Sequence, residues 1–332
     1  MDPLSGPIGI AFLGCGFATR LHSRTLKRVG DDVRRFYASR ELSRAEDYRR
    51  RYGGEGSFGS YEAALADPRV QVALVATPPA SHLELTLAAL SAGKHVILEK
   101  PPLMRSADFE AVAAATEAAG RRVFVAENYF YKPMAEALRG VLSRGEIGEP
   151  LILSVSALKE QRTAGWRDRV AMAGGGALFE GGIHWVNFMA NLGLPVARVH
   201  GFRPGRGGGP ERTMVVVFEY EGGAVGTLYH SWEIGSPLKG LRLSAIYGTE
   251  GAATFESNGL MLAVRGRRRR LKLPDPRDLL GYRAMFEDFL RSLRTGEPPR
   301  FDLPAARRDL ELVEAAYASA GAADNNESQG DG

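Results

Sequence analysis

The sequence predicts a two-domain α/β protein with a parallel sheet in its first half and an open, mainly antiparallel sheet in its second half. Apolar strands alternate with helical segments up to about residue 126, and beyond that point strands follow one another between glycine-rich turns. The 332 residues also exceed one ordinary domain, since domains average about 150 residues. We therefore expect a first domain over residues 1–126, a second over residues 127–320 and a flexible tail over residues 321–332.

In the first half, short apolar runs alternate regularly with helical segments. The expected strands cover residues 8–13, 34–39, 70–76, 95–99 and 122–126. The expected helices cover residues 19–29, 42–52, 82–92 and 106–119, and the last three stop at glycines. Apolar strands that alternate with helices of about 10–15 residues indicate βαβ units and a parallel sheet.

In the second half, strands dominate. The expected strands cover residues 151–157, 213–220, 224–231, 241–247 and 252–256, and the expected helices cover residues 133–143, 176–192, 278–295 and 304–320. Strands joined by glycine-rich turns, such as residues 221–223 and 248–251, are typical of an antiparallel or mixed sheet.

The composition excludes several classes of protein. Hydrophobic residues make up 44% of the chain and charged residues 25%, as in ordinary soluble domains, and no apolar run approaches the ~20 residues of a membrane helix. The single cysteine, Cys15, excludes an internal disulfide. The residues before the first strand lack the features of a signal peptide, so we expect a cytoplasmic protein.

The basic residues do not indicate a nucleic-acid partner. The net charge is +4, but 36 of the 43 basic residues are arginine, a skew typical of genome composition. Residues 265–270 read Arg-Gly-Arg-Arg-Arg-Arg without interleaved aromatic residues, which favours an exposed hairpin tip over a phosphate or nucleic-acid site. Neither nucleic acid nor a membrane is therefore expected as a partner.

The first candidate site is the loop between the first strand and the first helix, where residues 14–19 read Gly-Cys-Gly-Phe-Ala-Thr. Gly14 permits a tight turn, and Gly16 lets a pyrophosphate approach the backbone at the positive end of the helix. The alternative is a glycine-rich turn without a ligand. In this strand–turn–helix context the loop predicts a dinucleotide site that includes Gly14, Gly16, Phe17 and Ala18.

The second candidate site is the end of the next strand, where Ser39 and Arg40 stand. A cofactor with an unphosphorylated ribose would favour an acid at this place, yet the nearest acid is Glu41. A hydroxyl and a guanidinium suit a 2′-phosphate instead, so we expect NADP to be favoured over NAD. The alternative is a surface arginine on a solvated loop.

The third candidate is Lys100, which follows an apolar strand and precedes Pro101 and Pro102. Ligands of open parallel sheets bind outside the carboxyl ends of the strands, so Lys100 is expected to project toward a ligand. A partly desolvated lysine near a positive nicotinamide ring is suited to proton transfer. The alternative is a surface lysine paired with Glu99.

The fourth candidate is one face of the helix expected over residues 176–192. Glu180, His184, Asn187 and Asn191 follow the spacing i, i+4, i+7 and i+11, which places them on one face, whereas the other positions are apolar or small. A polar line on an apolar helix predicts the wall of a wet cleft, and a buried histidine is the alternative. One His and one Glu supply too few ligands for a metal.

These motifs occur in a characteristic order. The glycine loop is followed by Ala-Thr-Pro-Pro-Ala-Ser-His at residues 76–82, Ala-Gly-Lys-His-Val-Ile-Leu-Glu-Lys-Pro at 92–101, and Gly-Gly-Gly at 174–176 leading to Gly-Ile-His at 182–184. With them the chain resembles the Gfo/Idh/MocA family of oxidoreductases from about residue 8 to residue 320. The resemblance implies a Rossmann domain, then an α/β domain whose open sheet commonly forms homodimer or homotetramer contacts. It also implies NAD(P) chemistry on sugars, cyclitols or related polyols.

The resemblance assigns roles to individual residues. Lys100 and His184 match the family's lysine and catalytic histidine, and its motifs imply cofactor contacts by Thr77, Pro78, His82, Glu99 and Lys100. The common pattern has acids four residues before and three residues after the histidine, where this chain has Glu180 and Asn187. Glu180 keeps acid–base chemistry possible, whereas Asn187 changes the hydroxyl geometry that the site recognises. Thr19, in place of Gly or Ala, affects local packing.

We therefore expect an NAD(P)-dependent oxidoreductase that transfers a hydride between nicotinamide and a secondary alcohol or ketone of a polyol. His184 or Lys100 would move the proton, Glu180 would orient that pair, and Asn187 would bind a neighbouring hydroxyl. Other expected pocket residues are Tyr129, Trp166 and Arg167. The alternatives are a glycoside-cleaving enzyme that uses bound NAD(P) for transient oxidation and elimination, and a non-catalytic sensor that binds the cofactor.

Overall fold

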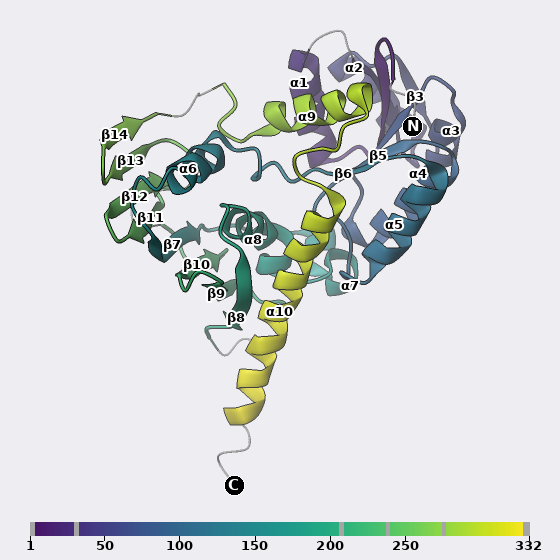
Figure 1. Cartoon of the computed structure of the whole chain (residues 1–332). Coiled ribbons are helices and arrows are strands. Elements are labelled where there is room, and N and C mark those ends of the chain that lie inside the picture. Colours follow the sequence, from purple (N-terminus) through teal and green to yellow (C-terminus); the bar gives the residue numbers. More distant parts are fainter. Residues whose placement is uncertain (1–3, 30–32, 206–208, 237–239, 274–276, 328–332) are drawn as a thin grey trace. The chain divides into compact units, whose positions relative to one another are not determined.

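The computed structural model describes residues 4–29, 33–205, 209–236, 240–273 and 277–327 (Figure 1). The chain folds into two units. The first comprises Met1–Glu127 with Tyr282–Arg307, and the second comprises Asn128–Gly281 with Arg308–Gly332. Each unit is built around its own sheet, which confirms the predicted fold class.

The first unit contains a six-stranded sheet in which all pairings are parallel. Its strands are β1 (Ile8–Leu13), β2 (Val33–Ala38), β3 (Gly56–Phe58), β4 (Val72–Val75), β5 (His95–Leu98) and β6 (Val123–Val125). They lie in the order β3-β2-β1-β4-β5-β6. Strands β1, β4 and β5 are buried along their whole length, as apolar strands covered on both faces should be. The strand order reverses between β1 and β4, and sheets of this type bind ligands beyond the carboxyl ends at such a switch point.

Helices connect these strands. They are α1 (Phe17–Val29), α2 (Leu42–Tyr52), α3 (Tyr61–Ala66), α4 (His82–Ser91), which follows the short turn η1 (Pro79–Ser81), and α5 (Asp108–Ala119). Helices α4 and α5 lie side by side (Figure 1). The sequence did not predict β3 or α3. Strand β3 has only three residues, all half-buried, and helix α3 has only six residues. Segments this short do not show a clear hydrophobic period.

Helix α9 (Tyr282–Thr295) packs with the first unit, whereas the sequence boundary assigned it to the second. The rings of Tyr282 and Phe286 contact His22 of α1 edge-on, and Phe289 packs against Phe124 of β6 with ring centroids 4.8 Å apart. A boundary drawn from the order of strands and helices assumes that each domain is continuous in sequence. The apolar face of α9 instead returns to the first core.

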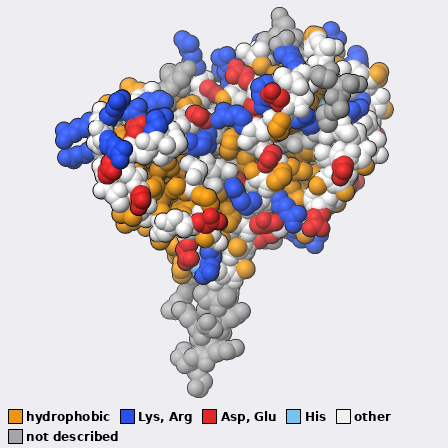
Figure 2. Space-filling view, in the orientation of Figure 1, with side chains coloured by type: hydrophobic (Ala, Val, Ile, Leu, Met, Phe, Trp, Pro, Cys, Tyr) orange, Lys and Arg blue, Asp and Glu red, His pale blue; other side chains and the backbone are white. Residues whose placement is uncertain are grey.

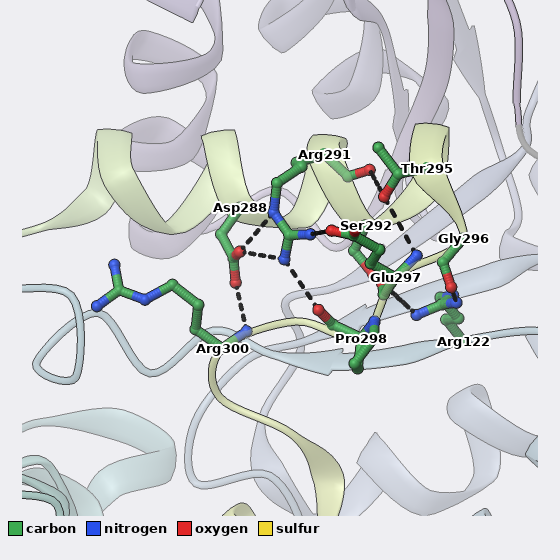
Figure 3. A network of polar contacts seen from close by, with 9 residues as sticks. All are labelled: Arg122, Asp288, Arg291, Ser292, Thr295, Gly296, Glu297, Pro298 and Arg300. Carbon is green, nitrogen blue, oxygen red and sulfur yellow. Dashed lines mark hydrogen bonds and ion pairs between the residues drawn. The ribbon is translucent and has the colours of Figure 1, made fainter.

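A polar network fixes the C-terminal end of α9 (Figure 3). Arg122, which precedes β6, donates from Nη1 to Ser292 Oγ at 3.0 Å and to the Glu297 carbonyl at 2.7 Å. Asp288 Oδ2 accepts from the backbone N–H of Arg300 at 2.8 Å. A cation at this end of a helix also interacts favourably with the last carbonyls, so the network holds α9 to the first unit by its polar end.

The second unit contains an eight-stranded mixed sheet. Its strands are β7 (Pro150–Leu158), β8 (Val196–Phe202), β9 (Thr213–Tyr220), β10 (Val225–Ser231), β11 (Leu243–Gly248), β12 (Gly251–Glu256), β13 (Leu262–Arg265) and β14 (Arg269–Lys272). They lie in the order β14-β13-β12-β11-β7-β10-β9-β8. In the part of the chain that the structure describes, β10 and β7 pair in parallel and the other neighbours are antiparallel. The sequence predicted five of these strands and missed β8, β13 and β14.

The helices of the second unit are α6 (Pro133–Ser143), the 3₁₀ turn η2 (Gly165–Asp168), α7 (Val170–Ala173), the π-helical turn η3 (Leu178–Gly182) and α8 (Ile183–Ala190). Helix α10 (Leu303–Glu327) ends the described chain and continues through most of the predicted flexible tail. Residues 328–332 of that predicted tail lie outside the described residues.

One face of the second sheet carries exposed apolar side chains. Ile152 of β7 is 56% exposed, and its register partners are Val225 of β10 and Tyr247 of β11, which are 42% and 49% exposed. The alternate positions Leu153 and Val155 are fully buried. The sheet therefore has one covered face and one open apolar face, and the three side chains form a row across the open one.

The arginine-rich segment is an exposed hairpin tip, as predicted. Arg265 of β13 pairs with Arg269 of β14, and Lys and Arg side chains gather at this hairpin (Figure 2). Acidic partners offset part of the charge, since Arg267 contacts Glu250 through Nε at 2.5 Å.

Within the described ranges, we find no helix with the length and apolar character needed to cross a membrane.

Candidate active site

The glycine loop joins β1 to α1 with geometry that suits a dinucleotide. Gly14 has a φ of +106°, and a Cβ on it would lie 2.9 Å from the Ala76 carbonyl oxygen, so the turn requires glycine. A Cβ on Gly16 would meet nothing within 4 Å, so the space beside this backbone is open. The first turn of α1 carries no acidic side chain, which leaves its positive end available to a pyrophosphate.

Three side chains belong to this loop. Thr19, the departure from the usual Gly or Ala, is fully buried and donates from Oγ1 to the Gly14 carbonyl at 2.6 Å. It therefore fixes the turn instead of disturbing it. Cys15 is buried, and burial raises the pKa of its thiol to about 11, so the thiol stays protonated near neutral pH. Phe17 is 65% exposed beside the loop.

Two cations lie at the end of β2 and in α2, and one of them contacts the same loop. Ser39 is buried and its Oγ accepts from the Glu41 backbone N–H at 3.3 Å, whereas Arg40 is exposed. Arg44, on the first turns of α2, donates from Nε to the Cys15 carbonyl at 3.0 Å. The sequence analysis missed Arg44, although a cation early in a helix, where acids are usual, was an available signal.

His82 joins the loops that follow β4 and β5. Its side chain is fully buried, with Nε2 2.9 Å from the Thr77 carbonyl oxygen and Nδ1 2.9 Å from that of Pro101. Burial lowers the pKa of His82, and these carbonyls oppose the shift only in part. Both ring nitrogens are therefore engaged by backbone, and His82 ties the loop at Thr77 to the loop at Pro101.

Glu99 forms a buried pair with His22 directly before Lys100. One carboxylate oxygen contacts His22 Nε2, and the other accepts from the Lys100 backbone N–H at 3.0 Å. Burial alone would raise the pKa of Glu99, but His22 and Lys100 hold it below its usual range, so the carboxylate is ionised. Glu99 therefore anchors the backbone at Lys100, and the sequence analysis did not anticipate His22.

The polar face in the second unit begins with a π-helical turn. Residues 178–182 form η3 and α8 follows from Ile183, whereas a single α-helix was predicted. A Cβ on Gly181 would lie 2.9 Å from Trp232 Cζ2, so close packing against this indole accounts for glycine in the turn. The wider turn changes the angular spacing on which the predicted face depended.

Four of the predicted pocket residues form two contacting pairs. Arg167 donates from Nε to Glu180 Oε1 at 2.5 Å, and Glu180 is only 6% exposed. The His184 imidazole is half-buried and stacks on the Tyr129 ring, with centroids 4.5 Å apart and planes 14° from parallel. A fifth predicted residue, Trp166, has its ring 4.5 Å from the Arg167 guanidinium carbon.

Asn187 does not take part as predicted. Its side chain is fully buried, and Nδ2 donates to Asp309 Oδ2 of α10 at 2.6 Å. Asn191 contacts the same carboxylate at 3.2 Å. The amide donor that was expected to bind a substrate hydroxyl is therefore already used inside the unit, because the π turn and α10 direct this position inward.

Two residues that the sequence analysis missed cap the start of this helical segment. Glu211, before β9, accepts from the Leu178 backbone N–H at 2.8 Å and from the Tyr317 hydroxyl at 2.8 Å. The Phe179 backbone N–H donates to the Tyr317 oxygen at 3.1 Å. Burial raises the pKa of Glu211. Neither residue stands in a motif, so no local pattern could have indicated them.

The described residues contain no group of three or more His, Cys, Asp or Glu side chains arranged to hold a metal ion. The candidate residues fall into two sets, one in each unit. The first set holds the glycine loop, Ser39, Arg40, Arg44 and Lys100. The second set holds Tyr129, Trp166, Arg167, Glu180 and His184.

Two family models match the chain. One is described as "Oxidoreductase family, NAD-binding Rossmann fold" and matches residues 8–127. The other is described as "GFO/IDH/MocA C-terminal domain" and matches residues 135–254. Together they cover more than half of the chain.

Similar proteins include named dehydrogenases. Trans-1,2-dihydrobenzene-1,2-diol dehydrogenase of Bos taurus is 30% identical over 248 residues, which are 71% of each chain. Levoglucosan dehydrogenase in complex with NADH has a TM-score of 0.85 at 21% identity and covers 95% of this chain and 97% of its own. Aldose-aldose oxidoreductase from Caulobacter crescentus has a TM-score of 0.85 at 22% identity, covering 96% and 98%.

The two structural neighbours share the fold at low identity, while the family models and the dihydrodiol dehydrogenase extend the likeness to sequence. The glycine loop between β1 and α1, and Lys100 after β5, stand within the first matched region. Glu180 and His184 stand within the second. The chain is an oxidoreductase of the GFO/IDH/MocA family, with an NAD-binding Rossmann fold in its first unit.

Proposed function

We propose that this enzyme interconverts a secondary alcohol and a ketone on a sugar, cyclitol or related polyol. The observation that carries the proposal is the half-buried His184 in α8, four residues after the buried Glu180 of the π turn η3. Stacking on Tyr129 holds the imidazole in one plane, and the Glu180 carboxylate is held by Arg167. The named relatives act on a dihydrodiol or are sugar oxidoreductases, which supports a substrate with hydroxyl groups.

The residues divide the chemistry as follows. A nicotinamide cofactor, held by the glycine loop and the residues at the end of β2, would supply the hydride chemistry. His184 or Lys100 takes the hydroxyl proton during oxidation and returns it during reduction. The ion pair of Glu180 and Arg167 sets the electrostatic environment of the proposed pocket around His184. Trp166, whose ring contacts Arg167, lines the same pocket. Asn187 is assigned no substrate contact, because its donor binds Asp309.

We further propose that NADP(H) binds more tightly than NAD(H). Arg40 is exposed at the end of β2, and Arg44 approaches the glycine loop from α2. Charge-assisted contacts to a 2′-phosphate contribute about 1.5–3 kcal/mol, which corresponds to roughly a ten- to hundredfold preference. Fluorescence titration of the wild type and of Arg40→Glu with NADPH and NADH measures this. Tighter NADH binding by the wild type would refute the assignment.

The proposed reaction is tested by product analysis. NADP⁺ and NAD⁺ are each offered with trans-dihydrodiols, anhydrosugars, aldoses and cyclitols, and reduced nicotinamide and ketone are both measured. The proposal predicts that one class gives the two products in equal amounts. Cleavage of a glycoside without net nicotinamide reduction would show the transient-oxidation chemistry instead. Tight cofactor binding with no product from any class would show a sensor.

Two further proposals concern the setting of the enzyme. We propose a homodimer or homotetramer formed through the second sheet, supported by the exposed row Ile152, Val225 and Tyr247. We also propose that it acts in the cytoplasm on a small molecule, since a single cysteine excludes an internal disulfide and the proposed chemistry uses NAD(P).

A further inference from the structure

A fully buried lysine contacts the aromatic ring on which the proposed catalytic histidine stacks. Lys132 is the residue before α6, and none of its surface is exposed. Its Nζ donates to the Ser257 carbonyl at 3.0 Å. The same ammonium lies 4.3 Å from the centroid of the Tyr129 ring and 5.3 Å from that of Trp185. Full burial is rare for a lysine, so this placement calls for an explanation.

Tyr129 connects this ammonium to the catalytic set. The ring that carries the Lys132 ammonium also stacks with the His184 imidazole at 4.5 Å, and it meets the Trp185 ring edge-on at 4.9 Å. Trp185 follows His184 in α8. The two aromatic residues nearest to the ammonium are therefore the stacking partner of His184 and its neighbour in the chain.

The turn that carries Tyr129 and Lys132 is itself fixed. The backbone N–H of Lys132 donates to the Tyr129 carbonyl at 3.3 Å. A Cβ on Gly281, whose φ is +76°, would lie 2.6 Å from the Lys132 backbone nitrogen. Asn128 Nδ2 donates to the Leu280 carbonyl at 2.6 Å. These contacts hold the backbone of the turn from outside it.

The energetics favour one position of that ring. A desolvated ammonium over an aromatic face contributes about 2 kcal/mol or more, and moving the ring would leave a buried charge with less compensation, which is costly. The ammonium thus restrains Tyr129, and Tyr129 restrains the imidazole through the stack.

We propose that Lys132 is a positioning residue, whose buried ammonium holds the Tyr129 ring as the platform that sets the plane of the His184 imidazole. The proposal rests on the role proposed above for His184. It assigns no contact between Lys132 and the substrate. Since small displacements of a proton-transfer group can cost about a hundredfold in rate, loss of the platform should lower turnover and leave cofactor binding unchanged.

The test uses nuclear magnetic resonance and kinetics on the full chain. Histidine is labelled at Cε1, and His184→Gln identifies the His184 resonance among the six histidines. The ring current of the stacked Tyr129 should displace that resonance from its position in a free peptide. Lys132→Met should return it toward the free position and lower kcat about tenfold to a hundredfold. Lys132→Arg, which keeps the cation, should retain most of the displacement of the His184 resonance and most of the wild-type kcat.

Two variants keep the test sharp. Lys132→Gln, which can still donate to the Ser257 carbonyl, replaces Lys132→Met if the latter does not fold. Arg242→Met is the matched control, because Arg242 also lies over the Trp185 ring, at 5.8 Å, and is assigned no role with Tyr129; it should leave the His184 resonance in place. An unchanged His184 resonance in the charge-free Lys132 variants would overturn the proposal. If the His184 resonance of the charge-free variants returns toward its free-peptide position while kcat is unchanged, the result would support the positioning by Lys132 and overturn the catalytic role of His184 instead.

Discussion

At residue 187, the buried amide constrains what substitution can do. From the sequence, Asn187→Asp would restore the acid that the family commonly has there. In the structure it would bring a second carboxylate within hydrogen-bond distance of Asp309, since the present contact is 2.6 Å. Both side chains are almost fully buried, and two adjacent carboxylates raise the pKa of the pair.

We therefore expect Asn187→Asp to destabilise the fold by about 2–4 kcal/mol near neutral pH. A carboxyl whose folded pKa lies above its unfolded value keeps its stability at low pH and loses it as the pH rises. The deficit should thus shrink toward about pH 4. Urea unfolding of both proteins at the two pH values measures it. Asn191→Asp is the control, because Asn191 is only half-buried and also contacts Arg308; an equal loss in both variants would contradict the account.

His95 gives a second prediction at this scale. Burial, with Arg121 and Arg122 nearby, lowers its pKa from 6.5 to about 4, and its Nδ1 accepts from the Arg122 backbone N–H at 3.1 Å. The folded state therefore favours the neutral imidazole of His95. The contribution of His95 to the free energy of unfolding is complete above the unfolded pKa of 6.5 and is lost as the pH falls toward about 4.

His95→Asn keeps an acceptor at this place without a titrating group. Between about pH 7.5 and about pH 4.5, the wild type should lose about 2 kcal/mol more unfolding free energy than the variant. Denaturant titrations at several pH values give the comparison. Parallel curves for the two proteins would show that His95 does not contribute to the acid sensitivity.

At the scale of elements, the polar end of α9 is the contact that is simplest to test. Arg122→Ala removes the bonds to Ser292 Oγ and to the Glu297 carbonyl that Figure 3 shows. Each such bond contributes about 0.5–1.5 kcal/mol, so the unfolding free energy should fall by about 1–3 kcal/mol. Arg28→Ala, on the exposed side of α1, should change it by less than about 0.5 kcal/mol. Equal effects in both variants would mean that the network does not anchor α9.

Long periodic elements could be predicted from the sequence, and short or irregular ones could not. Helices α2 and α6 and strand β9 match their predicted ranges to the residue, because each has a clear period and a clear end. Strand β14 was missed because all four of its residues are exposed. The π turn at residues 178–182 was missed because a helical pattern in the sequence does not distinguish a π turn from an α turn.

At the scale of the whole molecule, the open face of the second sheet predicts self-association. Ile152 lies between Val225 and Tyr247 across three strands, and a row of exposed apolar side chains on a sheet marks an interface. Ile152→Glu should convert the oligomer to a smaller species in sedimentation analysis. Thr227→Glu, at a half-buried position on β10, is a comparison that adds charge and removes no apolar side chain. A wild type that sediments as a monomer at micromolar concentration would contradict the proposed interface.

The candidate site was predictable where a motif carries it and unpredictable where tertiary contacts carry it. The glycine loop, Lys100 and His184 follow from local sequence patterns. Arg167 and Glu180 were both named, but their ion pair was not. The contact of Asn187 with Asp309 was not expected because Asp309 is far away in sequence. His22 and Lys132 were overlooked because their partners become visible only in the fold, whereas the cation early in α2 was a signal for Arg44 that the sequence analysis did not use.

The central claim is that Lys100 and His184 provide the proton chemistry of an oxidoreductase, and turnover of Lys100→Met at saturating substrate tests it most directly. General acid–base catalysis contributes about 10²–10⁴-fold, so kcat should fall by that factor while NADPH affinity and melting temperature stay at wild-type values. A variant whose kcat remains within about threefold of the wild type, well short of that acid–base contribution, would contradict the claim and leave Lys100 as a surface residue beside the buried Glu99.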